Sequence, residues 1–144
     1  MVELSGDDLA MFSSFEKITH VMPSDYLSTE TSIIFLVSRD SLGKAIGKQA
    51  TNIDKLKIIF RKRVVVVADS DDPEAFLRNF FGNIEIFHIE IRDIMGEKAM
   101  LVTIDEKNRG IAIGRDGERI KAAKVFMKKK FNATVQLRTR RTAI

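Results

Sequence analysis

Residues 43–53 read GKAIGKQATNI, and residues 110–120 read GIAIGRDGERI. The two stretches share one frame: Gly-x-Ala-Ile-Gly, two polar residues, a small residue, two further residues and Ile. They begin at Gly43 and Gly110, 67 residues apart, which is the size of a small domain. A glycine loop that carries a basic residue at the start of a helix is suited to hold a phosphate, because backbone amides and the helix dipole favour an anion there. Two such loops predict a protein that holds a nucleic-acid strand.

Lys48 and Arg115 occupy equivalent positions directly after the second glycine of each frame, so we expect both to reach phosphate oxygens. The missing side chains of the glycines let a sugar–phosphate strand come close. Ile46 and Ile113 are expected to anchor the loops and to form the floor of a groove for bases. The residues expected to bind the nucleic-acid strand are Ile46, Gly47, Lys48, Gln49, Ala50, Ile113, Gly114, Arg115, Asp116, Gly117, Arg119 and Lys121.

The pattern of apolar residues around the loops predicts an α+β protein of two small domains, residues 1–70 and 71–144. Each domain is expected to hold a sheet of about three strands covered by helices. The sequence SDDPE marks the boundary, with Asp72 suited to cap a helix that begins at Pro73. Because the link is short, we expect the domains to pack in a fixed pose.

Helices are predicted over residues 5–22, 42–46, 50–61, 73–81, 107–113 and 118–131, and strands over 32–38, 63–68, 84–92, 99–104 and 133–138. A further strand over residues 25–30 is an open alternative. Ser5 and Asp8 resemble a capping box, and Pro23 is expected to end the first helix. The alternation in IEIFHIEIR slips at Phe87 and His88. The tail TRRTAI is predicted to fray.

Charge alternates along the chain in step with the repeat. The net balance is −5 over residues 1–36, +5 over 37–70, −4 over 71–104 and +8 over 105–144, which gives the +4 of the whole chain. Both glycine frames therefore lie in basic segments. This distribution favours a polyanion-binding face over charge that serves solubility alone.

Composition excludes several classes of function. The chain has no cysteine and only two histidines, which leaves no disulfide framework, cysteine nucleophile or metal-site pattern. The N-terminus lacks the form of a secretory signal, and no apolar run is long enough to span a bilayer. No nucleophile elbow, Walker or dinucleotide-binding pattern occurs. We therefore expect a cytoplasmic protein that is not an enzyme, with no cofactor, metal, membrane or small-molecule substrate.

Ile-Gly-x-x-Gly between two helices, framed by strands, resembles the KH domain, whose loop clamps single-stranded nucleic acid. The extra helix and strand before the motif resemble the type II form. Two such units with a short link resemble the KH pair of the NusA-like transcription factors, in the short archaeal form. The resemblance implies single-stranded RNA and RNA polymerase as partners, and a role in transcription termination or antitermination.

The sequence departs from the family pattern at two places. The first loop ends in Ala50, which we expect to keep helical backbone angles while adding a methyl group where the strand passes. Asp116 introduces an acid into the second loop, where we expect it to point outward or to cap the following helix. Two other functions stay open: a structural component of a ribonucleoprotein, and a protein-interaction module that contacts polymerase through the acidic residues 1–36.

Overall fold

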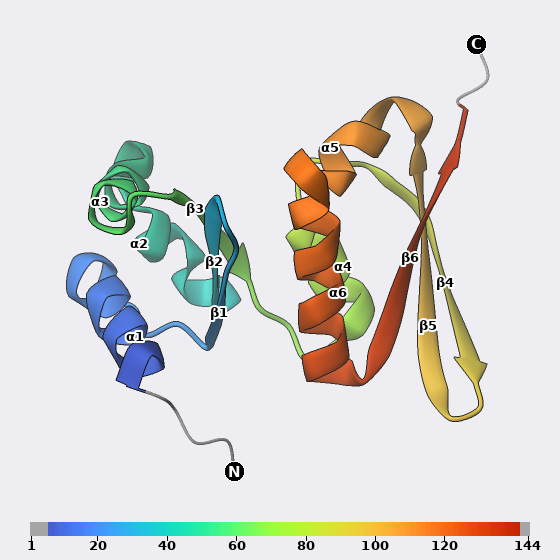
Figure 1. The fold of residues 1–144 in the computed structure, drawn as a ribbon, viewed down its shortest axis with the longest axis horizontal. Helices are drawn as coiled ribbons and strands as arrows, with labels where there is room; N and C mark the ends of the chain where they lie inside the picture. The colour runs from blue at the N-terminus through green and yellow to red at the C-terminus, as the bar shows by residue number, and fades with distance from the viewer. Residues whose placement is uncertain (1–5, 142–144) are drawn as a thin grey trace. The chain divides into compact units, whose positions relative to one another are not determined.

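The computed structural model describes residues 6–141, which form an α+β fold as predicted. The chain divides into two compact units, Met1–Ser70 and Asp71–Ile144. Each unit runs helix, strand, strand, helix, helix, strand, so the strand that the sequence left open is present in the first unit. Figure 1 shows the two units, and each is described by itself below.

The first unit contains a three-stranded sheet in the order β1–β2–β3. β2 pairs antiparallel with β1 and parallel with β3, whose register runs from Ser32–Arg63 to Val37–Ala68. The elements are α1 (Gly6–Thr19), β1 (Asp25–Ser28), β2 (Ser32–Val37), α2 (Leu42–Ile46), α3 (Thr51–Phe60) and β3 (Arg63–Ala68). One-turn 3-10 helices precede α2 and α3.

Alternate residues of β2 carry the core of the first unit. Ile33, Phe35 and Val37 belong to one buried cluster with Phe15 of α1 and Leu56 of α3. The rings of Phe15 and Phe35 lie 4.2 Å apart between their centroids. Because the side chains of a strand alternate between its two faces, this one stripe fixes the face on which the helices pack.

Tyr26 ties the sheet of the first unit to α1. Its hydroxyl donates a hydrogen bond of 2.6 Å to Oδ1 of Asp8. This bond, with burial and the Asp8 charge, raises the pKa of Tyr26 to about 12 from 10.0. The ring also packs edge-on against Phe12, so a single side chain fixes α1 on the sheet by polar and apolar contact.

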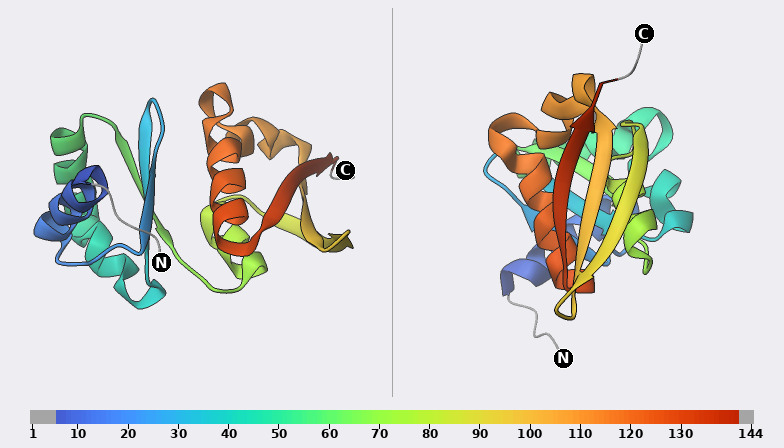
Figure 2. Two further views of the ribbon diagram at one scale, coloured as in Figure 1. Left: turned by 60° about the horizontal axis from the view of Figure 1, so that its bottom comes forward. Right: turned by 90° about the vertical axis from the view of Figure 1, so that its right-hand side faces the viewer.

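The second unit contains a three-stranded sheet in the order β4–β5–β6, with β5 in the centre (Figure 2). β5 pairs antiparallel with β4 and parallel with β6. The elements are α4 (Pro73–Phe80), β4 (Ile86–Ile94), β5 (Glu97–Asp105), α5 (Arg109–Ile113), α6 (Glu118–Phe131) and β6 (Ala133–Arg140). The register of β4 shifts between Ile86 and His88, where the alternation in the sequence slips.

Aromatic residues of α4 and α6 fill the core of the second unit. Phe76 and Phe126 are buried, with ring centroids 6.0 Å apart in an edge-on arrangement. Met100 and Val102 of β5 are fully buried beneath the helices. Phe126 and Met127 of α6 are both buried in this layer.

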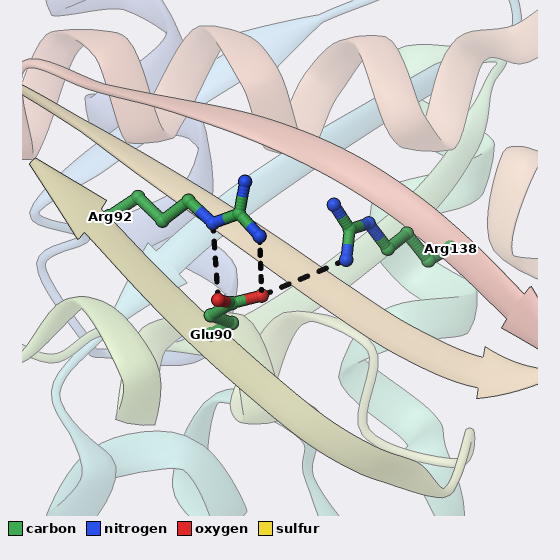
Figure 3. Close-up of polar contacts among 3 residues, drawn as sticks. All are labelled: Glu90, Arg92 and Arg138. Atoms are coloured by element: carbon green, nitrogen blue, oxygen red, sulfur yellow. Dashed lines mark hydrogen bonds and ion pairs between the residues drawn. The ribbon is translucent and has the colours of Figure 1, made fainter. Parts of the chain in front are cut away.

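A charged cluster covers the sheet face of the second unit that carries no helix. Glu90 of β4 accepts hydrogen bonds from Arg92 at 3.1 and 3.4 Å and lies 3.7 Å from Arg138 of β6, so the cluster spans the central strand (Figure 3). The hydrogen bond from Arg92 holds the pKa of the Glu90 carboxyl below its ordinary value. Leu101 is paired with Glu90 and Gln136, and it is 4% exposed. The charged side chains thus shield an apolar residue on an otherwise open face.

Several element ends differ from the expectations by a few residues: β4 spans Ile86–Ile94 and not 84–92, β5 spans Glu97–Asp105 and not 99–104, and α5 begins at Arg109 and not at residue 107. Two further differences have a local cause. α1 ends at Thr19 and not at Pro23, because the Thr19 hydroxyl donates to the carbonyl of Phe15 and accepts from the amide of Val21. β6 extends into the predicted tail as far as Arg140, which pairs with Asp105 of β5. Ser5, the first residue of the expected capping box, lies outside the described residues.

Candidate nucleic-acid interface

The two glycine loops are residues 47–50 and 114–117, and each begins with the second glycine of its frame, Gly47 or Gly114. They have the same backbone conformation at corresponding positions. At the first glycine, φ and ψ are 80° and 166° in Gly47 and 77° and 174° in Gly114. At the third position, φ and ψ are 56° and 34° in Gln49 and 54° and 25° in Asp116. Gln49 and Asp116 differ in charge and chemistry, so the shared glycine frame, and not the identity of every loop residue, directs the turn.

The same backbone hydrogen bonds close both loops. The amide of Gly47 donates to the carbonyl of Gly43 at 3.0 Å, and the amide of Gly114 donates to that of Gly110 at 3.0 Å. At the end of each loop, the fourth residue donates to the carbonyl of the first glycine, at 3.1 Å in both units. The sequence repeat is therefore a repeat of local structure.

A side chain has no room at the first glycine of either loop. A Cβ atom on Gly47 would lie 2.9 Å from Cγ of Asn52, and one on Gly114 would lie 2.7 Å from Cβ of Arg119. Both glycines also have positive φ, a region that side chains disfavour. Glycine is thus required at this position by close approach and by backbone conformation together.

The fourth position corrects an expectation. Ala50 does not keep the expected helical angles, since its φ and ψ are 59° and 26°, in the left-handed region. Gly117 has the corresponding values of 74° and 10°. The closing hydrogen bond and the start of the next helix impose this conformation, and they override the helical preference of alanine. An L-residue in this region costs about 1 kcal/mol, so Ala50 adds strain that Gly117 avoids.

The helices that follow the loops present N-terminal amides without a side-chain cap. α3 begins after Ala50 and α6 begins after Gly117, and neither junction has a side-chain capping bond. Of the two expectations for Asp116, an outward-facing side chain agrees with its exposure, and a cap on α6 does not form. By contrast, Asp72 caps α4 by accepting from the amide of Ala75 at 2.8 Å. The amides of Thr51 and Glu118, the first of each helix, donate to the carbonyls of Lys48 and Arg115. The helix dipole still favours an anion at these two helix starts.

The polar side chains of the loops face solvent. Lys48 and Arg115 are exposed, and within residues 6–141 neither side chain has a hydrogen bond or an ion pair. Gln49 and Asp116 are exposed as well. Lys121 lies one turn into α6, and its ammonium group donates to the backbone carbonyl of Asp116 at 3.4 Å. Each loop thus offers one uncommitted cation beside the helix amides.

The isoleucines before the first glycine are half-buried, and the alanines before them are fully buried. Ala45 and Ala112 fix α2 and α5 on their units, while Ile46 and Ile113 retain partial exposure at the loop. This burial fits both expected roles of the isoleucines, which are to anchor the loop and to offer apolar surface beside it.

Arg119 is committed to holding the loop. Its guanidinium donates to the carbonyl of Ile111 at 3.3 Å and to Oδ1 of Asn83 at 3.2 Å, and it lies 5.6 Å from the ring centre of Phe81. In the first unit, Nδ2 of Asn52 donates to the carbonyl of Lys44 at 3.1 Å. Asn52 and Arg119 are equivalent in the repeat, as are the two acceptors.

We call these two bridges the loop latches. Each ties the helix after a loop to the helix before it. Sequence reasoning missed Asn52 and assigned Arg119 to RNA contact. The sequence repeat could have identified both residues, because Asn52 and Arg119 are hydrogen-bond donors at the same offset from Gly47 and Gly114.

Other kinds of site find no support in the described part of the chain. Residues 6–141 contain no group of three or more His, Asp or Glu side chains that could hold a metal ion. None of the helices in that range is long and apolar enough to cross a membrane.

Comparison with known proteins gives consistent results. Residues 72–142 match the family described as KH domain. The chain is 29% identical over 131 residues to the "Probable transcription termination protein NusA" of Halococcus morrhuae, covering 91% of this chain and 94% of that protein. It is 28% identical over 122 residues to the protein of that name from Methanococcus vannielii, covering 85% and 70%. This chain is also similar to the protein in the crystal structure of APE1850, with 30% sequence identity and a TM-score of 0.79. The match covers 95% of this chain and 100% of that chain.

Proposed function

The chain belongs to the KH-domain family as a NusA-like protein, and on this premise we propose that both of its glycine loops bind the backbone of single-stranded RNA. In each loop, the phosphates lie against the loop backbone at the start of α3 or α6, where the helix dipole favours an anion. Lys48 and Arg115 provide the charge, and Ile46 and Ile113 provide apolar surface for the bases. Arg119 acts by positioning the second loop.

The observation that carries this proposal is the residue-by-residue match of the two loops. The first loop keeps the conformation of the second although its fourth residue is alanine, which is strained there. A turn that served only to connect two helices has no need of an exposed cation, a helix start without a side-chain cap and left-handed residues in both copies. Retention of all three features supports a shared task for the two loops.

The relatives suggest the setting in which the RNA is bound. Proteins similar over most of this chain are named as probable transcription termination proteins. We infer that this chain modulates transcription elongation, termination or antitermination in the cytoplasm, with RNA polymerase as a further partner. The acidic residues 1–36 are the candidate surface for a protein partner, because their charge is opposite to that of the loop segments.

The KH-domain, NusA-like family binds RNA and is not catalytic. For this chain we accordingly expect no hydrolysis of nucleotides or RNA in the presence of Mg²⁺. Release of inorganic phosphate or shortening of labelled RNA by the purified native chain, but not by a mock purification, would contradict this expectation.

Fluorescence anisotropy with labelled single-stranded RNA tests the proposed function, with duplex RNA and single-stranded DNA as competitors. The native chain is compared with Lys48→Glu and Arg115→Glu at two salt concentrations. We expect both variants to weaken binding and to lower the salt slope by about 0.7 for each phosphate that the variant no longer neutralises.

Lys98→Glu is the matched control, because Lys98 is exposed and lies on the β4–β5 hairpin, at the end of the sheet opposite to α5 (Figure 1). It changes the charge equally and is expected to affect binding far less. If a diverse RNA pool shows no binding to the native chain, or if Lys98→Glu weakens binding as much as Arg115→Glu, the loops are not the binding site.

A further inference from the structure

The first unit contains an open basic cleft that the glycine loops do not include. The cleft has a volume of about 640 Å³ and lies where α3 ends, next to the turn between β1 and β2 and the start of β3. This volume is in the range of ligand-binding pockets. We call it the α3 cleft, and its lining residues are Glu30, Thr31, Lys57, Arg61, Lys62 and Arg63.

The charges of the α3 cleft are strongly unbalanced. Four cationic side chains line it, against the single carboxylate of Glu30. Lys62 is held in place, since its ammonium group donates to the carbonyl of Thr29 at 2.7 Å and to Oγ of Ser28 at 3.1 Å. Lys57, Arg61 and Arg63 are exposed, and within residues 6–141 their side chains have no hydrogen bond or ion pair. The cleft thus holds one fixed cation and three that an anion can recruit.

The backbone at Arg61 is unusual for its residue type. Arg61 ends α3 with φ and ψ of 55° and 33°, in the left-handed region, and its amide donates to the carbonyl of Lys57 at 2.8 Å. Glycine or asparagine commonly fills this position, and the second unit uses Asn132 at the end of α6, with φ and ψ of 51° and 42°. Attraction to the helix dipole explains a cation near a helix end, but it does not explain an arginine at the one position where its backbone is strained.

We propose that the α3 cleft binds backbone phosphates of the RNA strand that the first loop holds. The inference rests on the proposed function and extends it to a second contact in the same unit. α3 has ten residues, so its two ends lie about 15 Å apart. A strand that leaves the first loop therefore reaches the cleft only if it is longer than the roughly four nucleotides that a KH loop clamps.

The chemistry of the cleft favours phosphate over a base or an apolar ligand. Guanidinium groups bind phosphate through two parallel hydrogen bonds, and Arg61 and Arg63 flank the fixed ammonium group of Lys62. The lining contains no aromatic side chain on which a base could stack. The contact is therefore expected to be independent of RNA sequence.

Dependence on RNA length tests the cleft separately from the loops. Anisotropy is measured with labelled single-stranded RNA pools of about four and about sixteen nucleotides, the span of known single-strand site sizes. Arg61→Glu is expected to weaken binding of the long RNA about tenfold, the value of one charge-assisted hydrogen bond, and to leave the short RNA unchanged. Lys17→Glu on α1 makes the same charge change at an exposed residue outside the cleft, and it is expected to bind both pools as the native chain does.

A second variant separates contact from stability. Arg61→Gly relieves the left-handed strain, so it is expected to raise the midpoint of chemical denaturation while it weakens binding of the long RNA. Native-like binding of the long RNA by Arg61→Gly and Arg61→Glu would overturn the inference, as would equal losses for both lengths. Cleft-dependent binding of an acidic peptide without any effect on RNA would also overturn it. If the native chain binds neither RNA length, the proposed function itself fails and the cleft contact fails with it.

Discussion

Ala50 and Gly117 occupy the same position in the two loops and adopt the same left-handed conformation, but only one of them suits it. Alanine at this position raises the free energy of the folded state, because an L-residue disfavours the left-handed region. The first loop therefore keeps its shape because of its surroundings, namely the closing hydrogen bond to Gly47 and the start of α3.

Reciprocal substitutions measure this strain. Ala50→Gly is expected to raise the free energy of unfolding by about 1 kcal/mol, and Gly117→Ala to lower it by a similar amount. Gly114→Ala should cost more, because its Cβ would also lie 3.0 Å from the backbone nitrogen of Arg119. Urea denaturation followed by circular dichroism gives all three values. An Ala50→Gly protein that is less stable than the native chain would show that the left-handed assignment is wrong.

Tyr26 provides a residue-scale test of the packing of α1. It is the only tyrosine and the chain has no tryptophan, so absorbance of tyrosinate reports this residue alone. The hydrogen bond to Asp8 raises its pKa to about 12, above the ordinary 10.0. We expect the native chain to titrate near the higher value and the denaturant-unfolded chain near the lower one.

The raised pKa of Tyr26 determines how the stability of the folded protein changes with pH. The unfolded chain loses the Tyr26 proton first, so the stabilisation is complete below pH 10.0 and is lost as pH rises toward about 12. Tyr26→Phe should remove this part of the alkaline decline. An equally steep decline in the native and Tyr26→Phe proteins would contradict the contact between Tyr26 and Asp8.

At the scale of elements, the latches explain how a short loop between two helices keeps one shape. Asn52 and Arg119 each donate across a loop to a carbonyl of the preceding helix, and Arg119 adds a bond to Asn83 ahead of β4. The loop amides are therefore held for a ligand before it arrives, which lowers the ordering cost of binding.

Replacing the latch residues separates positioning from contact. Arg119→Met keeps the length of the side chain and removes its hydrogen bonds, so it is expected to cost about 1–3 kcal/mol of stability for two bonds. Hydrogen exchange at the amides of the second loop should become faster, and RNA affinity should fall with little change in salt slope. Asn52→Ala should affect only the first loop. A drop in salt slope equal to that of Arg115→Glu would instead make Arg119 a phosphate contact.

Much of the element order could be read from the sequence because apolar periodicity and turn residues agree locally. The slip at Phe87 and His88 became a register shift in β4, and Asp72 caps α4 as expected. Other features depend on distant partners. The extension of β6 to Arg140 needs the length of β5, and the latch of Arg119 needs Asn83, 36 residues away. The left-handed angles of Ala50 could not be read locally, since alanine by itself favours a helix.

At the scale of the whole molecule, the charge balance separates the segments that carry the loops from those that do not. Residues 37–70 and 105–144 are basic, while residues 1–36 and 71–104 are acidic. A polyanion is attracted to the former and repelled from the latter, which orients it before any specific contact forms. RNA is therefore expected at both loops and not at a single one.

Combining loop variants tests whether both loops act on one strand. Losses in binding free energy from Lys48→Glu and Arg115→Glu are expected to add in the double variant, because the residues belong to separate sites with no shared partner. Anisotropy with a long single-stranded RNA measures all three proteins. If the second substitution causes no further loss, one loop alone holds the RNA.

The most direct test of RNA binding by the paired loops is amide-resolved NMR of the native chain during titration with single-stranded RNA. We predict that the largest shift changes occur together at residues 47–52 and 114–119. Changes confined to one loop would reduce the paired site to a single one. Changes centred on the open sheet face, with both loops unaffected, would contradict RNA binding by the loops.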